Sequence, residues 1–376
     1  MTRTLWVTND LPPRAGGIEQ FVHHLLERLP GAETRVIASR WPGDAAHDAT
    51  LPYRVERYRR PLLPTPALLA RVRAAVEEHQ PEVVVFGAAW PLAELADRVG
   101  RPTLAFTHGH EAGIVRVGGG PLIRRVARKV DALGVISGFT RRALGPWVEP
   151  QAIVHELPPG VDVARFHPGV DGGPVRARHG VPEGAPLVVC VGRLVARKGQ
   201  DVLVEAWPAV LRAHPDARLL LVGEGPLGER LAKRVHALGL GERVLFAGGI
   251  DWRELPAHHA AADLFAMPCR TRLGGLDVEG LGIVYLEAQA CGVPVLAGDS
   301  GGAPEALLAG RSGEVVDGRD PGAVAAALSR LLADPVALRA MGVEGRAFVE
   351  RAYSWDAIGG RLREVIRNLA AMPPPR

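Results

Sequence analysis

The chain alternates short β-branched, apolar runs with helical segments, and this alternation occurs in two successive series. The runs expected to be strands are 4–8, 34–39, 82–87, 103–107, 132–137 and 152–157, then 186–192, 218–223, 243–248, 263–268 and 293–298. Apolar runs that are buried on both faces and separated by helices are typical of parallel sheets. At 376 residues the chain is too long for one ordinary core. The pattern therefore predicts an α/β protein with two Rossmann-like domains facing a central cleft.

A segment rich in Gly and Pro, residues 166–186, separates the two series and is expected to be the interdomain linker. This divides the chain into an N-terminal domain over 1–168 and a C-terminal domain over 169–353. The sequence from Asp334 to Ala371 predicts two helices around Ser354. We expect residues 354–376 to form a C-terminal helix and tail that return to the N-terminal domain.

Composition excludes several classes of protein. With 47% hydrophobic and 23% charged residues the chain is globular, and its three cysteines (190, 269 and 291) form no CxxC pair. A disulfide framework and a zinc knuckle are therefore not expected, which favours a reducing cytoplasm. No signal-peptide pattern and no stretch of 18 apolar residues is found, which predicts a soluble or peripheral protein. The net charge of +4 favours anionic partners, but the basic residues are not interleaved with aromatics, so nucleic acid is not expected.

Two glutamates, Glu279 and Glu287, lie eight residues apart at an expected helix. If that helix begins just after Gly280, eight residues rise by roughly 12 Å, comparable to the span of a nucleotide-sugar from its sugar to its ribose. One carboxylate would then bind hydroxyls of the sugar and the other those of the ribose. Glutamates that simply cap and solvate an amphipathic helix give the same spacing. The Gly-rich segment before the helix favours the ligand site.

The start of the same helix suits an anion. Gly282, Ile283 and Val284 would expose unpaired N–H groups at the positive end of the helix dipole. A diphosphate between the sugar and the ribose fits this position.

Each domain also has a Gly-rich or basic turn where a strand meets a helix, which is where open α/β sheets bind ligands. Gly16 and Gly17 precede a helix expected from about Ile18, and both permit close backbone approach, although an ordinary glycine turn looks the same. In the second domain, Arg193 and Lys198 follow the first strand and could converge on one anion. A solvated basic loop is the alternative.

The segment THGHE offers His108, His110 and Glu111 after the fourth expected strand. Two histidines at i and i+2 make a metal site conceivable. No further cluster of ligand spacing accompanies them, and no DxD motif occurs in the chain, so no metal site is predicted. One histidine is expected to cap the next helix, and the other to meet the reacting sugar.

These motifs resemble those of the GT-B glycosyltransferases of family 4, and more narrowly their actinobacterial mannosyltransferase branch. The resemblance covers essentially the whole chain, from TNDLPPRAGGIEQF through FGAAWPLA, THGHE, LPPGVDVARFHP and GRLVARKGQD to RTRLGGLDVEGLGIVYLEAQACG and YSWD. GRLxxxKG together with E-x7-E is quite specific for the superfamily. The resemblance implies a GT-B fold with an N-terminal acceptor domain and a C-terminal nucleotide-sugar domain.

The resemblance also implies roles for particular residues. Arg193 and Lys198 would bind the diphosphate, Glu287 the ribose and Glu279 the sugar. Gly16 and Gly17 would close on the phosphate.

The single cleft histidine of the family follows a strand as T-x-H or T-H. This pattern maps to His108 rather than to His110, which makes His108 and Glu279 the candidate catalytic residues. Where the family often has E-G-F-G, this chain has Leu281, which we expect only to alter packing.

The implied reaction is a retaining transfer of mannose from GDP-mannose to a lipid-linked phosphatidylinositol mannoside, adding the second, α-1,6-linked mannose without a cofactor or an obligatory metal. No candidate nucleophile is evident, which favours front-face attack. Three alternatives stay open. One is a family 4 enzyme that uses a UDP-sugar on another acceptor, and one is a GT-B epimerase. The third is a nucleotide-binding module without transfer activity, which would have no use for Glu279 or His108.

A lipid-linked acceptor would place the protein peripherally on the anionic inner face of the plasma membrane. Two segments of the N-terminal domain, 57–76 and 115–130, combine basic and apolar residues in a way that suits this. The residues concerned are Arg57, Arg59 and Arg60 with Leu62 and Leu63, and Arg124, Arg125, Arg128 and Lys129 with Ile123 and Val126. The alternative is amphipathic helices that pack on the core and solvate their basic faces.

Overall fold

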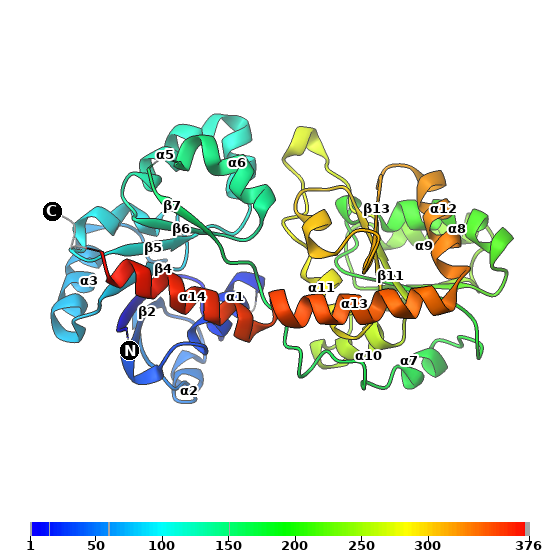
Figure 1. Ribbon diagram of the computed structural model, residues 1–376, viewed down its shortest axis with the longest axis horizontal. Helices are drawn as coiled ribbons and strands as arrows, with labels where there is room; N and C mark the ends of the chain where they lie inside the picture. The colour runs from blue at the N-terminus through cyan, green and yellow to red at the C-terminus, as the bar shows by residue number, and fades with distance from the viewer. Residues whose placement is uncertain (1, 15, 59–60, 150, 373–376) are drawn as a thin grey trace. The chain divides into compact units, whose positions relative to one another are not determined.

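The computed structural model describes residues 2–14, 16–58, 61–149 and 151–372, and the chain divides into two compact units. The first unit comprises Met1–Gly160 together with Trp355–Arg376, and the second comprises Val161–Ser354. Each unit contains one parallel sheet with helices on both faces (Figure 1). This is the α/β organisation with two Rossmann-like domains that the strand pattern predicts.

The sheet of the first unit is parallel throughout, because the helices that connect its strands return the chain to the same edge. Its strand order is β3 (Arg54–Tyr58), β2 (Thr34–Ser39), β1 (Thr4–Thr8), β4 (Val83–Phe86), β5 (Thr103–Phe106), β6 (Ala132–Val135) and β7 (Ile153–Glu156). Side chains alternate between the faces, which makes two cores. Leu5 and Val7 pack with α3 (Pro66–His79), α5 (Gly120–Ala127) and α6 (Gly138–Val148). Trp6 packs with α1 (Gly17–Leu26) and α14 (Trp355–Ala370).

The chain's last helix belongs to the first unit, as we expected of residues 354–376. In Figure 1 α14, drawn in red, lies beside α1. Its buried residues Ile358, Leu362 and Ile366 recur every three or four positions, so one face of the helix covers the sheet. Two shorter helices, α2 (Asp44–Asp48) and α4 (Glu111–Ile114), complete the α-helices described in this unit.

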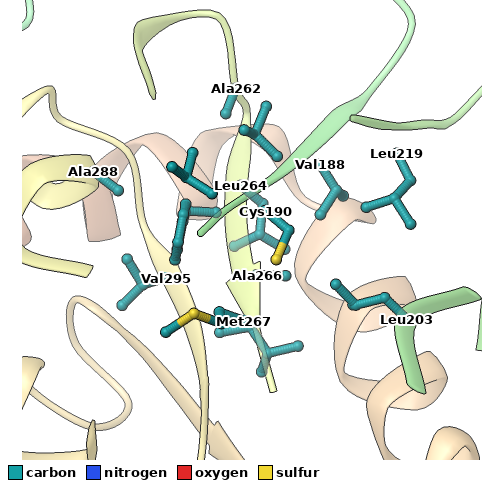
Figure 2. Packing of buried hydrophobic residues seen from close by; sticks show 14 of the residues in the cluster. Val188, Cys190, Leu203, Leu219, Ala262, Leu264, Ala266, Met267, Ala288 and Val295 are labelled. Carbon is teal, nitrogen blue, oxygen red and sulfur yellow. The ribbon is translucent and has the colours of Figure 1, made fainter. Parts of the chain in front are cut away.

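The second unit has a parallel sheet in the order β10 (Val244–Gly248), β9 (Arg218–Val222), β8 (Leu187–Val191), β11 (Leu264–Met267), β12 (Val295–Gly298) and β13 (Gly313–Val316). Its α-helices are α7 (Gly173–Arg178), α8 (Gln200–Ala213), α9 (Gly228–Ala237), α10 (Leu255–Ala260), α11 (Ile283–Ala290), α12 (Pro321–Leu332) and α13 (Pro335–Tyr353). Figure 2 shows the centre of the core, where Val188, Leu264 and Val295 come from three neighbouring strands.

Two strands, β3 and β13, were not among those expected from the sequence. Both lie at the edge of a sheet, and none of the five residues of β3 is buried. Neither β3 (RVERY) nor β13 (GEVV) has the continuous apolar run of the central strands, so the pattern that revealed those strands is missing.

Residues 166–186 do not form a linker. Phe166 and Val175 lie in the core of the second unit, and α7 falls inside the segment. The second unit begins at Val161, whose backbone N–H donates to the carbonyl of Tyr353 at 2.7 Å. The first unit therefore ends at Gly160 rather than at residue 168, because the Gly/Pro-rich segment supplies packed side chains as well as turns.

In the part of the chain that the structure describes, no single helix is long and apolar enough to cross a bilayer. The pair α12 and α13, bent by 98°, meets the length and composition criteria only when the two helices are taken together.

Candidate functional site

In each sheet there is a point where the strand order reverses, and open α/β sheets bind ligands beyond the carboxyl ends of the strands at such a point. In the second unit this point lies between β8 and β11, which pair in parallel. The loop after β8 carries Arg193 and Lys198, and the loop after β11 leads to Glu279. The strand order therefore brings together motifs that are far apart in the sequence.

Lys198 and Glu279 form the central contact of this site. The Lys198 Nζ lies 2.8 Å from Glu279 Oε2, and the two side chains are only 12% and 9% exposed. The Glu279 backbone N–H donates to Ser300 Oγ at 3.2 Å, which holds the glutamate from a second side. A carboxylate fixed in this way presents its remaining lone pairs in a defined direction.

Arg197 belongs to the same site, although the sequence motif by itself does not indicate it. Its Nε lies 3.6 Å from Glu279 Oε2, and its guanidinium lies 3.5 Å from the carboxylate of Asp277. Arg197 and Lys198 sit in one short 3₁₀ turn, Ala196–Lys198. The spacing of GRLVARKG alone does not tell which of two adjacent cations faces the carboxylate, and here both do.

Arg193 differs from Lys198 in its surroundings. Its side chain is exposed, and among the residues that the structure describes it has no hydrogen-bond or ion-pair partner. The preceding Gly192 has φ 146°, which suits glycine and turns the chain out of β8. An unpaired guanidinium at the end of β8 remains available to an anion, while Lys198 is already paired.

The helix after Glu279 begins later than the sequence suggested. Gly282 is the N-cap of α11, with φ 84°, and the first helical residue is Ile283 rather than a residue just after Gly280. Helical rise therefore separates Ile283 from Glu287 by only about 6 Å, and the 12 Å span expected for the two glutamates does not apply. Gly282, Ile283 and Val284 do occupy the start of α11, as predicted.

Glu287 lies in the last half of α11, with its side chain 13% exposed. Its Oε2 is buried and has no hydrogen-bond partner among the described residues. His259 of α10 faces this oxygen, with its Nε2 at 3.5 Å. His259 was not singled out from the sequence, because a histidine in a helix gives no sign of which neighbouring element it contacts.

In the first unit, Gly16 and Gly17 begin α1 as predicted. A Cβ on Gly16 would lie 2.1 Å from Glu19 Oε2, and Glu19 is itself paired with Arg14 Nε at 2.7 Å. A side chain at Gly16 would therefore displace the Glu19 carboxylate from its place beside Arg14, which a flexible side chain can accommodate, and Gly16 fits an ordinary glycine turn. A Cβ on Gly17 would meet no described atom within 4 Å, so the backbone there is open to a ligand.

His108 follows β5 and is held from two sides. Its ring Nε2 lies 2.7 Å from the Gly87 carbonyl, and its backbone N–H donates to Glu111 Oε2 at 3.0 Å. A carbonyl only accepts, so the proton of the neutral ring is on Nε2 and Nδ1 keeps its lone pair. Burial lowers the pKa of His108, which keeps the ring neutral at pH 7.

The side chain of His110 is 58% exposed. His110 is the N-cap residue of α4, but its ring makes no hydrogen bond that caps the helix. The carboxylate of Glu111 accepts from the backbone N–H groups of His108 and Gly109 at 3.0 Å each, so a glutamate rather than a histidine closes this turn. The expected histidine cap is therefore wrong. Among the described residues, no group of three or more His, Cys, Asp and Glu is placed to hold a metal ion.

A cavity of about 1040 Å³ also lies in the second unit, beside the predicted donor residues rather than on them. It is lined by α8, α9 and residues 270–273. Two of its arginines are already neutralised by carboxylates of the same wall, Arg270 by Asp201 and Arg234 by Glu205. The lining also includes Arg230, Lys233, Arg272 and Arg319, so the cavity, like the site at the end of β8, has an excess of basic residues.

The two segments considered for membrane contact are partly folded into the core. Leu62, Ile123 and Val126 are buried, because they cover the sheet of the first unit. Leu63 and Val117 are 49% and 67% exposed. Arg59 and Arg60 lie outside the described residues.

The basic residues between positions 124 and 129 have different partners. Arg125 and Lys129 pair with Glu94 at 3.1 and 3.0 Å. Arg124 lies over the ring of Trp147, with its guanidinium carbon 4.9 Å from the ring centroid. Arg128 is exposed. Part of the basic surface is therefore structural, and part of it is open to solvent.

Comparison with known proteins identifies the family. Residues 15–165 match Glycosyltransferase Family 4, and residues 174–348 match Glycosyl transferases group 1. A GDP-mannose-dependent alpha-(1-6)-phosphatidylinositol monomannoside mannosyltransferase of Mycolicibacterium smegmatis is 47% identical, over 96% of this chain and 97% of its own length. A GDP-mannose-dependent monoacylated alpha-(1-6)-phosphatidylinositol monomannoside mannosyltransferase of Corynebacterium glutamicum is 42% identical, over 97% and 98%.

Solved structures show the same fold. Anabaena HepE in complex with UDP aligns with a TM-score of 0.80 over 97% of this chain and all of that chain, at 19% identity. Sucrose-phosphate synthase from Thermosynechococcus elongatus aligns with a TM-score of 0.76 over 98% and 99%, at 25% identity. With two Rossmann-like units and relatives that match almost end to end, the chain belongs to family 4 of the GT-B glycosyltransferases.

Proposed function

We propose that this glycosyltransferase transfers mannose from GDP-mannose to a phosphatidylinositol mannoside, adding the second mannose in α-1,6 linkage. The names of the full-length relatives support this donor and acceptor. The structural observation that carries the proposal is the buried pair of Lys198 and Glu279 near the end of β8. The Arg193 side chain, which has no partner among the described residues, precedes this pair in the same loop, and the start of α11 follows Glu279.

The roles of the donor residues follow from their chemistry. Arg193 and Lys198 supply positive charge for the diphosphate, and Arg197 adds to that field. Departure of GDP leaves negative charge on the β-phosphate, which these cations and the N–H groups at Gly282, Ile283 and Val284 stabilise.

The two glutamates bind the ends of the donor. Glu279, oriented by Lys198 and Ser300, binds hydroxyls of the mannose, and Glu287 binds those of the ribose. Gly17 leaves room for the phosphate at the start of α1, next to Gly16.

His108 is proposed as the residue at the reacting face of the sugar. The neutral ring donates a hydrogen bond from Nε2–H to the Gly87 carbonyl, so its Nδ1 can accept a hydrogen bond from a sugar hydroxyl. No side chain is assigned as a nucleophile, so front-face attack is the proposed route of the retaining transfer.

Incubating the purified chain with radiolabelled GDP-mannose or UDP-sugars, with and without phosphatidylinositol monomannoside, tests the proposal. Transfer from GDP-mannose to the lipid, with none from UDP-glucose, is expected. Transfer from a UDP-sugar alone would favour the alternative family 4 activity. Binding of GDP with no transfer to any acceptor would favour a module without chemistry.

We further propose that the first unit contacts the anionic inner face of the membrane, where a lipid acceptor would be reached. Arg124 and Arg128 supply exposed charge, and Leu63 and Val117 supply exposed apolar side chains.

A further inference from the structure

We propose that His259 is a positioning residue for Glu287, donating a hydrogen bond from Nε2 to Oε2 so that the other carboxylate oxygen faces the ribose of the donor. This inference rests on the proposed role of Glu287 and extends it to a residue in a neighbouring helix.

His259 is fully buried, and neither of its ring nitrogens has a hydrogen-bond partner among the described residues. Buried polar groups in folded proteins are normally paired, so an unpaired imidazole indicates a missing or shifted contact. Glu287 Oε2 is also buried and unpaired, and it lies 3.5 Å from His259 Nε2. A movement of a few tenths of an ångström brings the two atoms to hydrogen-bond distance.

The surroundings of His259 limit which groups its N–H can reach. Its ring packs against those of Phe166 and Phe265, with centroids 5.9 and 5.5 Å away. Neither phenylalanine offers a hydrogen-bond partner, so Glu287 Oε2, at 3.5 Å, is the acceptor that the Nε2–H of His259 faces. A single N–H directed at Glu287 fixes the carboxylate in one orientation.

Arg165 also acts on Glu287 electrostatically. However, its guanidinium stacks on the Trp252 ring at 3.7 Å and donates to the Trp252 carbonyl, and among the described residues it makes no hydrogen bond to Glu287. This leaves His259 as the side chain that faces the buried oxygen.

The test is titration calorimetry of the full chain with GDP and with 2′,3′-dideoxy-GDP, which lacks the hydroxyls that Glu287 would bind. His259→Phe keeps the ring volume and removes the N–H, and should weaken GDP binding roughly tenfold. His259→Gln keeps a donor near the Nε2 position and should restore most of the affinity. Binding of the dideoxy nucleotide should be the same in all three proteins, which a merely structural defect would not produce.

A matched control is His258→Phe. His258 is equally buried on the same helix, but its Nδ1 bonds the Glu254 carbonyl, so its loss should leave the ratio of GDP to dideoxy-GDP affinity unchanged. The double variant His259→Phe/Glu287→Gln should bind GDP no more weakly than Glu287→Gln alone. If His259→Phe does not fold, His259→Leu takes its place.

Two results separate the possible failures. GDP affinity unchanged in His259→Phe, while Glu287→Gln binds weakly, would overturn the role of His259 and leave the donor site intact. GDP affinity unchanged in Glu287→Gln would overturn the ribose contact itself, and the role of His259 with it.

Discussion

Replacing Lys198 by Met tests whether the buried ion pair organises the donor site. The substitution keeps most of the side-chain volume and leaves the Glu279 carboxylate without its closest cation, which lies at 2.8 Å. Removing one partner of a fully buried pair costs about 3–5 kcal/mol, whereas an exposed pair is worth about 0–1 kcal/mol. Because the two side chains are 12% and 9% exposed, the buried limit applies more closely.

Arg197 reduces the cost, since its Nε is 3.6 Å from the same oxygen and can replace part of the lost charge. We therefore expect a loss of about 2 kcal/mol in the free energy of unfolding. For a unit of this size, this corresponds to a fall in Tm of about 4–8 °C. GDP should bind about 30- to 100-fold more weakly as well, because a charge-assisted contact to the diphosphate is lost.

The assay is thermal unfolding and GDP calorimetry on Lys198→Met, Glu279→Gln and the double variant. Neutralising the glutamate removes the unpaired charge, so the double variant should be more stable than the sum of the single changes predicts, by about 1–2 kcal/mol. Lys233→Met is the control, since Lys233 and Glu229 are 80% and 91% exposed and the change should stay below about 0.5 kcal/mol. Additive effects in the cycle, with no fall in Tm for Lys198→Met, would refute the reasoning.

Four further outcomes are expected. His108→Ala should lower kcat about 100-fold or more with little change in GDP affinity. His110→Ala should change kcat and GDP affinity by less than about threefold each. Steady-state kinetics and calorimetry measure the two quantities. Burial lowers the pKa of His108 below its ordinary value of 6.5, so the unfolded chain takes up this proton first as the pH falls. The stability that His108 contributes is therefore retained above pH 6.5 and lost as the pH falls below it. Urea unfolding from pH 8 to 5 should show a fall in stability that is smaller in His108→Ala but not absent, because burial also lowers the pKa of His23, His155 and His179. Transfer should persist in EDTA, and a loss that Mg²⁺ or Mn²⁺ restores would instead point to a metal. Sedimentation with anionic vesicles should exceed that with neutral ones, decline with salt and weaken in Arg124→Glu/Arg128→Glu; equal binding to both vesicles would contradict the membrane proposal.

The sequence by itself determined the central strands and the class of fold. Strands such as Leu187–Val191 are buried on both faces, so all their residues are apolar and the strand appears in the sequence as a continuous apolar run. The edge strands β3 and β13 were missed because charged residues interrupt them, whereas the edge strand β10 keeps an apolar run and was predicted. Local signals also located the beginnings of α1 and α11 to within a few residues, through Gly16 and Gly282.

The tertiary structure decided which side chains meet. The pairing of β8 with β11 placed Lys198 and Arg197 against Glu279, and the packing of α10 on α11 placed His259 against Glu287. It likewise assigned Leu62 to the core and left Leu63 exposed. Such contacts depend on strand order and on how helices pack, which join residues from distant parts of the chain, whereas the periodicity of a sequence reports only on neighbours along one element.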